Sequence, residues 1–199
     1  MIAVIDYGAG NLFSVKNALD YLGIENIITA EKREIIRADG LILPGVGAFP
    51  DAMRMLRQAG LADLIRDAAV QKPLLGICLG MQLLFETGFE FGETEGLALL
   101  PGRVDRIETS FKIPHMGYNE LQFGRPCPLL SGVPEGSCVY FVHSYMAKTD
   151  PAYIAAYAGY GAQIPALVQK GTVYGAQFHP EKSGEPGLNI LKNFGGLAK

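Results

Sequence analysis

Short apolar runs alternate with amphipathic stretches through the first half of the chain, and this alternation constrains the fold more than any other feature. An apolar run at 2–6 precedes a helical pattern at 11–22, and a second run follows at 25–29. Residues 40–45 and 73–78 have the pattern of two more buried strands. Continuous apolar strands separated by helices predict a parallel sheet covered on both faces, with ligands beyond the carboxyl ends of its strands.

The pattern changes after Gly92. Short alternating strands then follow one another between Gly- and Pro-rich turns, in the segments RVDRIE, HMGYNELQF, VYFVHSY, YIAAYA, ALVQK and VYGAQF. Further helices are expected at 51–57, 61–71, 79–86 and from about 186 onward. We therefore predict a three-layer, flavodoxin-like α/β fold, in which antiparallel strands are added to a mostly parallel sheet, in a single domain over residues 1–199.

Charge and cysteine content restrict the classes of partner. The net charge is -3 and there is no Lys/Arg run, so the sequence gives no electrostatic reason to expect nucleic acid or a membrane surface. No apolar stretch is long enough for a spanning helix and no signal peptide is recognisable, so we expect a cytoplasmic protein. Three cysteines without CxxC spacing favour neither a disulfide framework nor structural zinc.

The segment GICLG (76–80) has the pattern of a nucleophile elbow around Cys78. An apolar strand ends there and a helical pattern begins, and the flanking glycines permit the tight turn that exposes a nucleophile. A helix N-terminus also favours a thiolate, and the N–H of Leu79 is placed to bind an oxyanion. The pentapeptide alone fits a buried core cysteine at least as well.

The segment FHPE (178–181) strengthens the interpretation of Cys78 as a nucleophile. It follows another apolar strand, so that His179 and Glu181 come just past a strand end. Side chains at i and i+2 of an extended segment share a face, which allows Glu181 to orient the imidazole of His179 while that imidazole faces the thiol. The alternative is a surface turn with an incidental His and Glu.

The other two histidines, His115 and His143, are as compatible with ordinary hydrogen-bonding roles as with function. No short spacing such as HxxxH supports a zinc site with a cysteine. We expect neither a metal nor a cofactor, because P-loop and dinucleotide-binding motifs are also missing from the sequence.

Four segments in this order, LPGVGAFPDAM, GICLGMQLLFE, PHMGYN and QFHPEKS, carry a resemblance to the class I (triad) glutamine amidotransferases. The resemblance runs from residue 2 to the last helix. PGVGAF and PHMGYN make the chain similar, more narrowly, to the glutaminase subunits of imidazole glycerol phosphate synthases. Tyr118 stands where those subunits usually carry Trp, which keeps an aromatic side chain at that position.

The resemblance implies a set of roles for residues of this chain. Cys78 would attack the carboxamide of glutamine, His179 would carry protons, and Glu181 would hold the imidazole. The oxyanion would be bound by backbone N–H groups of Leu79 and of the loop at 45–47, which includes Val46 and Gly47. Substrate contacts would come from Gln82, Gly47, the backbone of Ser144 and Tyr145 and, with weaker support, Glu90. Gln82 lies one helical turn after Cys78, and its alternative is a solvated helix residue.

The resemblance also implies a partner. In the resembled synthases the ammonia is used by a cyclase subunit with a (β/α)8 barrel, which would bind the phosphorylated substrate. Candidate residues for the contact with this partner are Met116, Tyr118, Asn119, Tyr140 and Lys182, with ordinary strand and turn packing as the alternative.

Two other functions remain open at the level of sequence. One is a stand-alone cysteine hydrolase or peptidase of similar fold, which would need no partner. The other is a flavodoxin-like binding module in which Cys78 is inert core. Partner dependence of glutamine hydrolysis separates the first from the proposed amidotransferase, and labelling of Cys78 by a glutamine-analogue electrophile separates the second.

Overall fold

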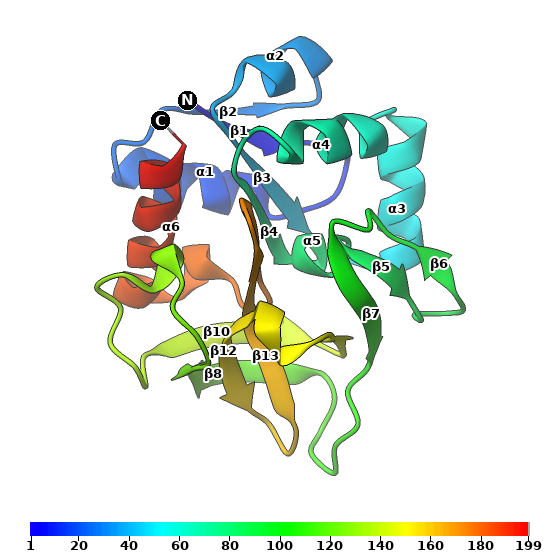
Figure 1. Cartoon of the computed structure of the whole chain (residues 1–199), viewed down its shortest axis with the longest axis vertical. Coiled ribbons are helices and arrows are strands. Elements are labelled where there is room, and N and C mark those ends of the chain that lie inside the picture. The colour runs from blue at the N-terminus through cyan, green and yellow to red at the C-terminus, as the bar shows by residue number, and fades with distance from the viewer. Residues whose placement is uncertain (199) are drawn as a thin grey trace.

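The computed structural model describes residues 1–198, and its centre is an eight-stranded sheet (Figure 1). Five neighbouring strands run parallel and the last three continue the sheet in antiparallel fashion. Across the sheet the strands are β2 (Asn26–Thr29), β1 (Ile2–Ile5), β3 (Gly40–Gly45), β4 (Leu74–Cys78), β14 (Val173–Ala176), β13 (Gln163–Lys170), β12 (Ile154–Gly159) and β9 (Gln122–Phe123). The fold predicted from the sequence is thereby confirmed.

Helices cover both faces of the parallel part, as the apolar strands predict. Alternate side chains of β1 enter two separate cores: Ile2 and Val4 pack with helices α1 and α6, whereas Ala3 and Ile5 pack with α2, α3 and α4. Figure 1 shows α1 and α6 on one side of the sheet and α3 and α4 on the other. The helices are α1 (Leu12–Tyr21), α2 (Lys32–Arg37), α3 (Phe49–Gln58), α4 (Ala62–Ala69), α5 (Leu79–Gln82) and α6 (Gly184–Leu197).

The antiparallel strands differ from the expectation in one respect, because only some of them join the main sheet. Two small sheets form beside it. One pairs β8 (His115–Glu120) with β10 (Cys138–His143), and the other contains β11 (Tyr145–Lys148), β7 (Leu100–Arg106), β5 (Phe85–Gly88) and β6 (Thr94–Glu95). Short 3-10 helices η1 (Pro128–Leu130), η2 (Pro151–Tyr153) and η3 (Pro180–Lys182) complete the chain.

The helix expected at 79–86 is wrong in its second half. Helix α5 ends at Gln82, and the backbone of 83–85 instead accepts hydrogen bonds from residues 97–100. Leu83 and Leu84 are fully buried there. None of the helices in the described part of the chain is long and apolar enough to cross a membrane.

Candidate active site

Three neighbouring strands of the main sheet end at one place and bring the predicted site together. Strand β4 lies between β3 and β14, all three parallel, with Gly45 opposite Cys78 on one side and Ala176 opposite Ile77 on the other. The loop after β3, the cysteine at the end of β4 and the histidine after β14 therefore meet at the carboxyl edge of the sheet, where ligands bind in such folds.

Cys78 stands on a strained turn between β4 and α5. Its backbone has φ 54° and ψ −112°, a conformation that residues with a Cβ rarely adopt. The turn needs glycine on both sides: a Cβ on Gly76 would lie 2.6 Å from the carbonyl oxygen of Gly80, and a Cβ on Gly80 would overlap the carbonyl of Leu43. This is the geometry of a nucleophile elbow, and it explains the spacing GICLG.

The thiol of Cys78 is shielded, with 7% of the residue exposed. Its Sγ lies 3.8 Å from the carbonyl oxygen of Val142 in β10 and 3.9 Å from Nε2 of Gln177, which follows β14. Strand β10 thus covers one side of the thiol.

His179 and Glu181 form a buried pair, with 3% and 0% of their side chains exposed. Nδ1 of His179 lies 2.8 Å from Oε1 of Glu181, and the same oxygen accepts a 3.2 Å hydrogen bond from Nδ2 of Asn11. Nε2 of His179 is buried and has no partner that meets hydrogen-bond geometry. The imidazole is therefore fixed through one nitrogen and keeps the other for proton transfer.

The charge state of His179 depends on its two neighbours. Burial lowers its pKa, but the nearby thiol of Cys78, the hydrogen bond to Glu181 and the negative charges of both outweigh burial and raise the pKa to about 9. A protonated imidazole beside the thiol favours the thiolate, which is the nucleophilic form of cysteine.

A cleft of about 170 Å³ opens beside Cys78. It contains every residue that the sequence places in the oxyanion site or in contact with substrate, and His143 in addition. The lining residues are Val46, Gly47, Cys78, Leu79, Gln82, Glu90, His143, Ser144 and Tyr145.

Gln82 is not the solvated helix residue of the alternative interpretation, because it is 4% exposed. Its Nε2 donates to the carbonyl oxygen of Tyr145 at 2.9 Å and to Oε1 of Gln177 at 3.0 Å. Both amide protons are thus used within the protein, and only the carbonyl oxygen of its side chain is left for a ligand.

The loop between β3 and α3 supplies the other wall. Gly47 has φ +96°, which favours glycine, and Val46 is 46% exposed. Oε2 of Glu90 accepts a 2.8 Å hydrogen bond from the backbone N–H of Phe49, the first residue of α3. Glu90 therefore anchors the end of this loop while it also lines the cleft.

Known proteins match both the sequence and this geometry. The sequence pattern of the family "Glutamine amidotransferase class-I" matches residues 3–196. The chain belongs to this family. It is therefore an enzyme of the glutamine-hydrolysing type.

Curated relatives and solved structures agree with the family. The chain is 54% identical over 200 aligned residues to "Imidazole glycerol phosphate synthase subunit HisH" of Bacillus cereus, an alignment that covers 100% of this chain and 96% of the relative. The protein of the same name in Bacillus thuringiensis is 52% identical with the same coverage. A solved glutamine amidotransferase has a TM-score of 0.79 at 23% identity, covering 100% of this chain and 99% of the other. The solved structure of PurLQS from Thermotoga maritima has a TM-score of 0.75 at 19% identity, covering 97% of this chain and 96% of the other.

Four of the five residues predicted to contact a partner of this amidotransferase form one patch. Met116 and Tyr118 are 59% and 62% exposed, and the Tyr118 hydroxyl donates to the carbonyl oxygen of Lys182 at 3.0 Å. The Tyr118 and Tyr140 rings are 5.4 Å apart, and the Lys182 ammonium lies 6.0 Å from the centre of the Tyr140 ring. The side chain of Asn119 points elsewhere, to His115 and the carbonyl oxygen of Gly159.

Two residues beside Cys78, His179 and Glu181 were not predicted from the sequence. Asn11 holds Glu181 from 170 positions away in the chain, and Gln177 lies between Cys78 and Gln82. Gln177 directly precedes FHPE in the sequence, so its position near the site could have been predicted. No local pattern indicates that Asn11 lies there. Among residues 1–198 no three His, Cys, Asp or Glu side chains are grouped as a metal site.

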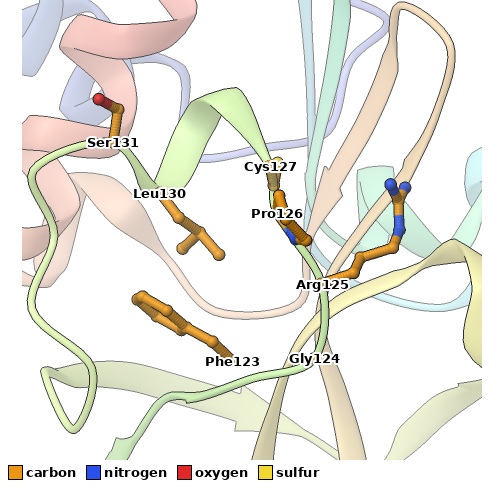
Figure 2. A pocket seen from close by; sticks show the side chains of 7 residues that line it. All are labelled: Phe123, Gly124, Arg125, Pro126, Cys127, Leu130 and Ser131. Atoms are coloured by element: carbon orange, nitrogen blue, oxygen red, sulfur yellow. The ribbon is translucent and has the colours of Figure 1, made fainter.

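A larger hollow of about 430 Å³ shares no residue with the cleft beside Cys78 (Figure 2). Phe123 and Leu130 face one another across it, while the side chain of Arg125 extends away to donate to the carbonyl oxygen of Gln169. Cys127 in its wall is buried, and burial raises the pKa of its thiol. Burial thus outweighs the backbone N–H groups of Leu129 and Leu130 and the charge of Arg125, which lower this pKa, so the thiol is not activated.

Proposed function

We propose that this chain is the glutaminase subunit of an imidazole glycerol phosphate synthase, with Cys78, His179 and Glu181 as its catalytic triad. The observation that carries the proposal is identity above 50% along the whole chain to subunits of that name, combined with the triad geometry at the carboxyl edge of the sheet. The family match and the continuous main sheet support a single domain over residues 1–199.

In the first half of the reaction the Cys78 thiolate attacks the carboxamide carbon of glutamine. The tetrahedral oxyanion is bound by backbone N–H groups of Leu79 and of the Val46–Gly47 loop, both of which line the cleft. Protonated His179 gives its proton to the leaving nitrogen. Ammonia departs and a glutamyl thioester on Cys78 remains.

In the second half, His179 is neutral and accepts a proton from water. The resulting hydroxide attacks the thioester, and the tetrahedral intermediate expels the Cys78 thiolate and releases glutamic acid, whose new carboxyl group gives its proton to solvent. The thiolate–imidazolium pair is thereby restored. Glu181 holds Nδ1–H of His179 in both halves and stabilises the imidazolium. Gln82, Glu90, Ser144 and Tyr145 bind the amino-acid part of the substrate from the walls of the cleft.

The ammonia serves a partner subunit. We propose that this partner is the cyclase with a (β/α)8 barrel, and that it binds the phosphorylated substrate of histidine biosynthesis and forms imidazole glycerol phosphate and an aminoimidazole carboxamide ribotide. The exposed aromatic patch of Met116, Tyr118, Tyr140 and Lys182 supports a contact of this kind, since aromatic residues and Met are enriched in interface cores. We place both subunits in the cytoplasm, together with the biosynthetic reaction.

The decisive experiment measures glutamate production by the purified chain alone and with the cyclase added. We expect turnover to rise strongly with the cyclase, and imidazole glycerol phosphate to form only in the complex. Strong turnover without a partner would indicate a stand-alone hydrolase, and none in either case would contradict the glutaminase.

Two tests isolate Cys78. A glutamine-analogue electrophile should label Cys78 and leave the other two cysteines unmodified, whereas an inert core cysteine would not react. Cys78→Ala should abolish glutamine-dependent synthesis by the complex but leave ammonia-dependent synthesis intact. Loss of both activities would assign Cys78 a structural role.

A further inference from the structure

A line of hydrogen bonds outside the triad connects strand β8 with the wall of the glutamine cleft. Nδ1 of His143 lies 2.8 Å from the carbonyl oxygen of Tyr145, and its Nε2 lies 3.0 Å from Nδ1 of His115. Nε2 of His115 lies 2.7 Å from Oδ1 of Asn119, whose Nδ2 donates to the carbonyl oxygen of Gly159 at 3.0 Å. The two imidazoles are buried, with 0% of His115 and 6% of His143 exposed.

The protons in this line can be counted. The Tyr145 carbonyl only accepts, so Nδ1 of His143 must carry a proton. The contact between the two rings needs one proton, and the contact with the Asn119 oxygen needs a proton on Nε2 of His115. Three contacts therefore need three ring protons, whereas two neutral imidazoles carry only two.

Reversing the Asn119 amide does not remove the shortage. The amide nitrogen would then donate to Nε2 of His115, but its oxygen would face the carbonyl oxygen of Gly159, and one contact would again join two acceptors. Either orientation leaves the neutral pair one proton short. An unpaired buried acceptor costs free energy, and the neutral pair always leaves one contact between two acceptors. A third proton converts this contact into a hydrogen bond.

The surroundings place that third proton on His115. Its ring is stacked between Phe141 and Tyr160, with centroids 4.7 and 3.9 Å away, and aromatic faces attract a cation. The uncharged groups around the pair are Asn119 from β8, Phe141 from β10, and Tyr160 with the Gly159 carbonyl at the end of β12. A further titratable group is His179, whose positive charge lowers the pKa of His143. The Tyr160 hydroxyl donates to the carbonyl oxygen of Lys112.

The pair also reaches the substrate. The Tyr145 carbonyl accepts from His143 and from Gln82, and all three residues line the cleft beside Cys78. We propose that His115 and His143 are positioning residues for the glutamine site: His143 holds the Ser144–Tyr145 wall through the Tyr145 carbonyl, and a third shared proton on His115 fixes the pair to Asn119 and so to strand β8. The inference rests on the proposed glutaminase function for its kinetic readout, but not for its readout of protonation.

The surroundings of the three histidines shift their pKa values by different amounts or in different directions. Burial lowers the pKa of His143 to about 3, and the pKa of His179 is raised to about 9 by its neighbours, against its burial. Burial also lowers the pKa of His115, while its hydrogen bond with Asn119 raises it. Burial is the larger of the two effects, so the pKa of His115 lies below its ordinary value.

The first test is nitrogen-15 NMR of the imidazoles in the intact chain, assigned with single His variants. As the pH is lowered from about 8 to about 5, the range in which an imidazole ordinarily changes charge, His115 should gain its second N–H while His143 keeps its proton on Nδ1. A His115 ring that stays singly protonated down to about pH 5 overturns the proposal. This measurement needs no partner, so it is independent of the proposed function.

The second test compares His115→Gln with His115→Leu in the complex with the cyclase. The glutamine amide carries two N–H groups and does not titrate, so it can satisfy both neighbours at any pH. We expect His115→Leu to raise KM for glutamine about five- to ten-fold with a smaller change in kcat, as for one lost hydrogen bond. His115→Gln should stay within about two-fold of the low-pH value of the wild type.

The pH profile separates positioning from mere packing. The ratio of the wild-type KM to the KM of His115→Gln should rise with pH, because only the wild type loses a proton at position 115. Effects of pH on the residues that both proteins share cancel in this ratio. Asn119→Asp should shift this rise to higher pH, since a carboxylate raises the pKa of a neighbouring imidazole. A flat ratio, or equal KM values for the Leu and Gln variants, would contradict the proposal, whereas an inactive wild type would count against the glutaminase assignment instead.

Discussion

Oε1 of Glu181 lies 2.8 Å from Nδ1 of His179, and the carboxylate belongs to a side chain that is completely buried. A buried carboxylate keeps its charge only when it is paired and hydrogen-bonded, and here the partners are His179 and the amide of Asn11. Glu181 therefore fixes the imidazole and raises its pKa, while His179 and Asn11 both bind one oxygen of the carboxylate.

The first prediction concerns Glu181→Gln. The amide keeps the volume but removes the charge, so the imidazolium loses stabilisation while the proton carrier itself remains. We expect kcat to fall toward the ~10²-fold end of general acid–base effects, and His179→Ala toward the ~10⁴-fold end. Steady-state glutaminase assays of the complex measure both. Equal losses would mean that orientation by Glu181 matters as much as the proton carrier.

The second prediction is a pH dependence of stability. The pKa of His179 is raised from 6.5 to about 9 in the folded protein, so folding is favoured by this group below pH 6.5 and loses that contribution as the pH rises through about 9. The contribution is at most roughly 3 kcal/mol. Urea denaturation across this range should show the loss, and a smaller loss in Glu181→Gln, where one of the groups that raise this pKa is missing. Identical slopes in the two proteins would exclude Glu181 as a cause.

The third prediction uses the strained backbone at Cys78. Glycine suits φ 54° and ψ −112° better than any residue with a Cβ, so Cys78→Gly should be more stable than Cys78→Ala by about 1 kcal/mol. Both variants lack the thiol, which makes the comparison independent of chemistry. Denaturant titrations measure the difference.

The control for the third prediction is Ala3→Gly, in the fully buried regular strand β1. Glycine there should destabilise the fold, as it does in ordinary strands. If the glycine variant at position 78 were also the less stable one, the turn would not be strained and the nucleophile would not be held by the backbone.

The strand ends that carry the site could be predicted from the sequence, but the contacts between them could not. Cys78 and His179 each follow an apolar run, and parallel strands bring such ends to one edge. That β14 lies directly beside β4 depends on pairing between segments about a hundred residues apart, which no local pattern encodes. For the same reason the role of Asn11 could not be predicted, because its contact with Glu181 spans 170 positions.

The wrong prediction at 79–86 has a specific cause. Residues 79–85 have a helical pattern, yet Leu83 to Phe85 are buried and pair with residues 97–100. Backbone hydrogen bonds to a distant segment replaced those of the helix, because they let the apolar side chains reach the core. The short α5 that remains is enough to present Cys78 and to place Gln82 in the cleft.

The last prediction tests the proposed partner surface at Tyr118. Its ring is 62% exposed, packs near Tyr140 and is tied to Lys182 through its hydroxyl, so it forms a rigid aromatic projection with little conformational entropy to lose on binding. Tyr118→Ala should weaken binding of the cyclase about ten-fold or more, as expected for an interface residue that contributes above 1.4 kcal/mol.

The matched control for Tyr118 is Tyr21→Ala. Tyr21 is 79% exposed at the end of α1, and α1 runs from the carboxyl edge of the sheet back to the opposite edge, away from the patch. Its removal should leave the affinity for the cyclase unchanged within about two-fold. Titration of labelled cyclase with each variant gives the two dissociation constants. Equal affinities of the Tyr118→Ala and Tyr21→Ala variants would place the partner on another face. In that case the stability of Tyr118→Phe would show whether the hydroxyl bond to Lys182 serves only the fold of this subunit.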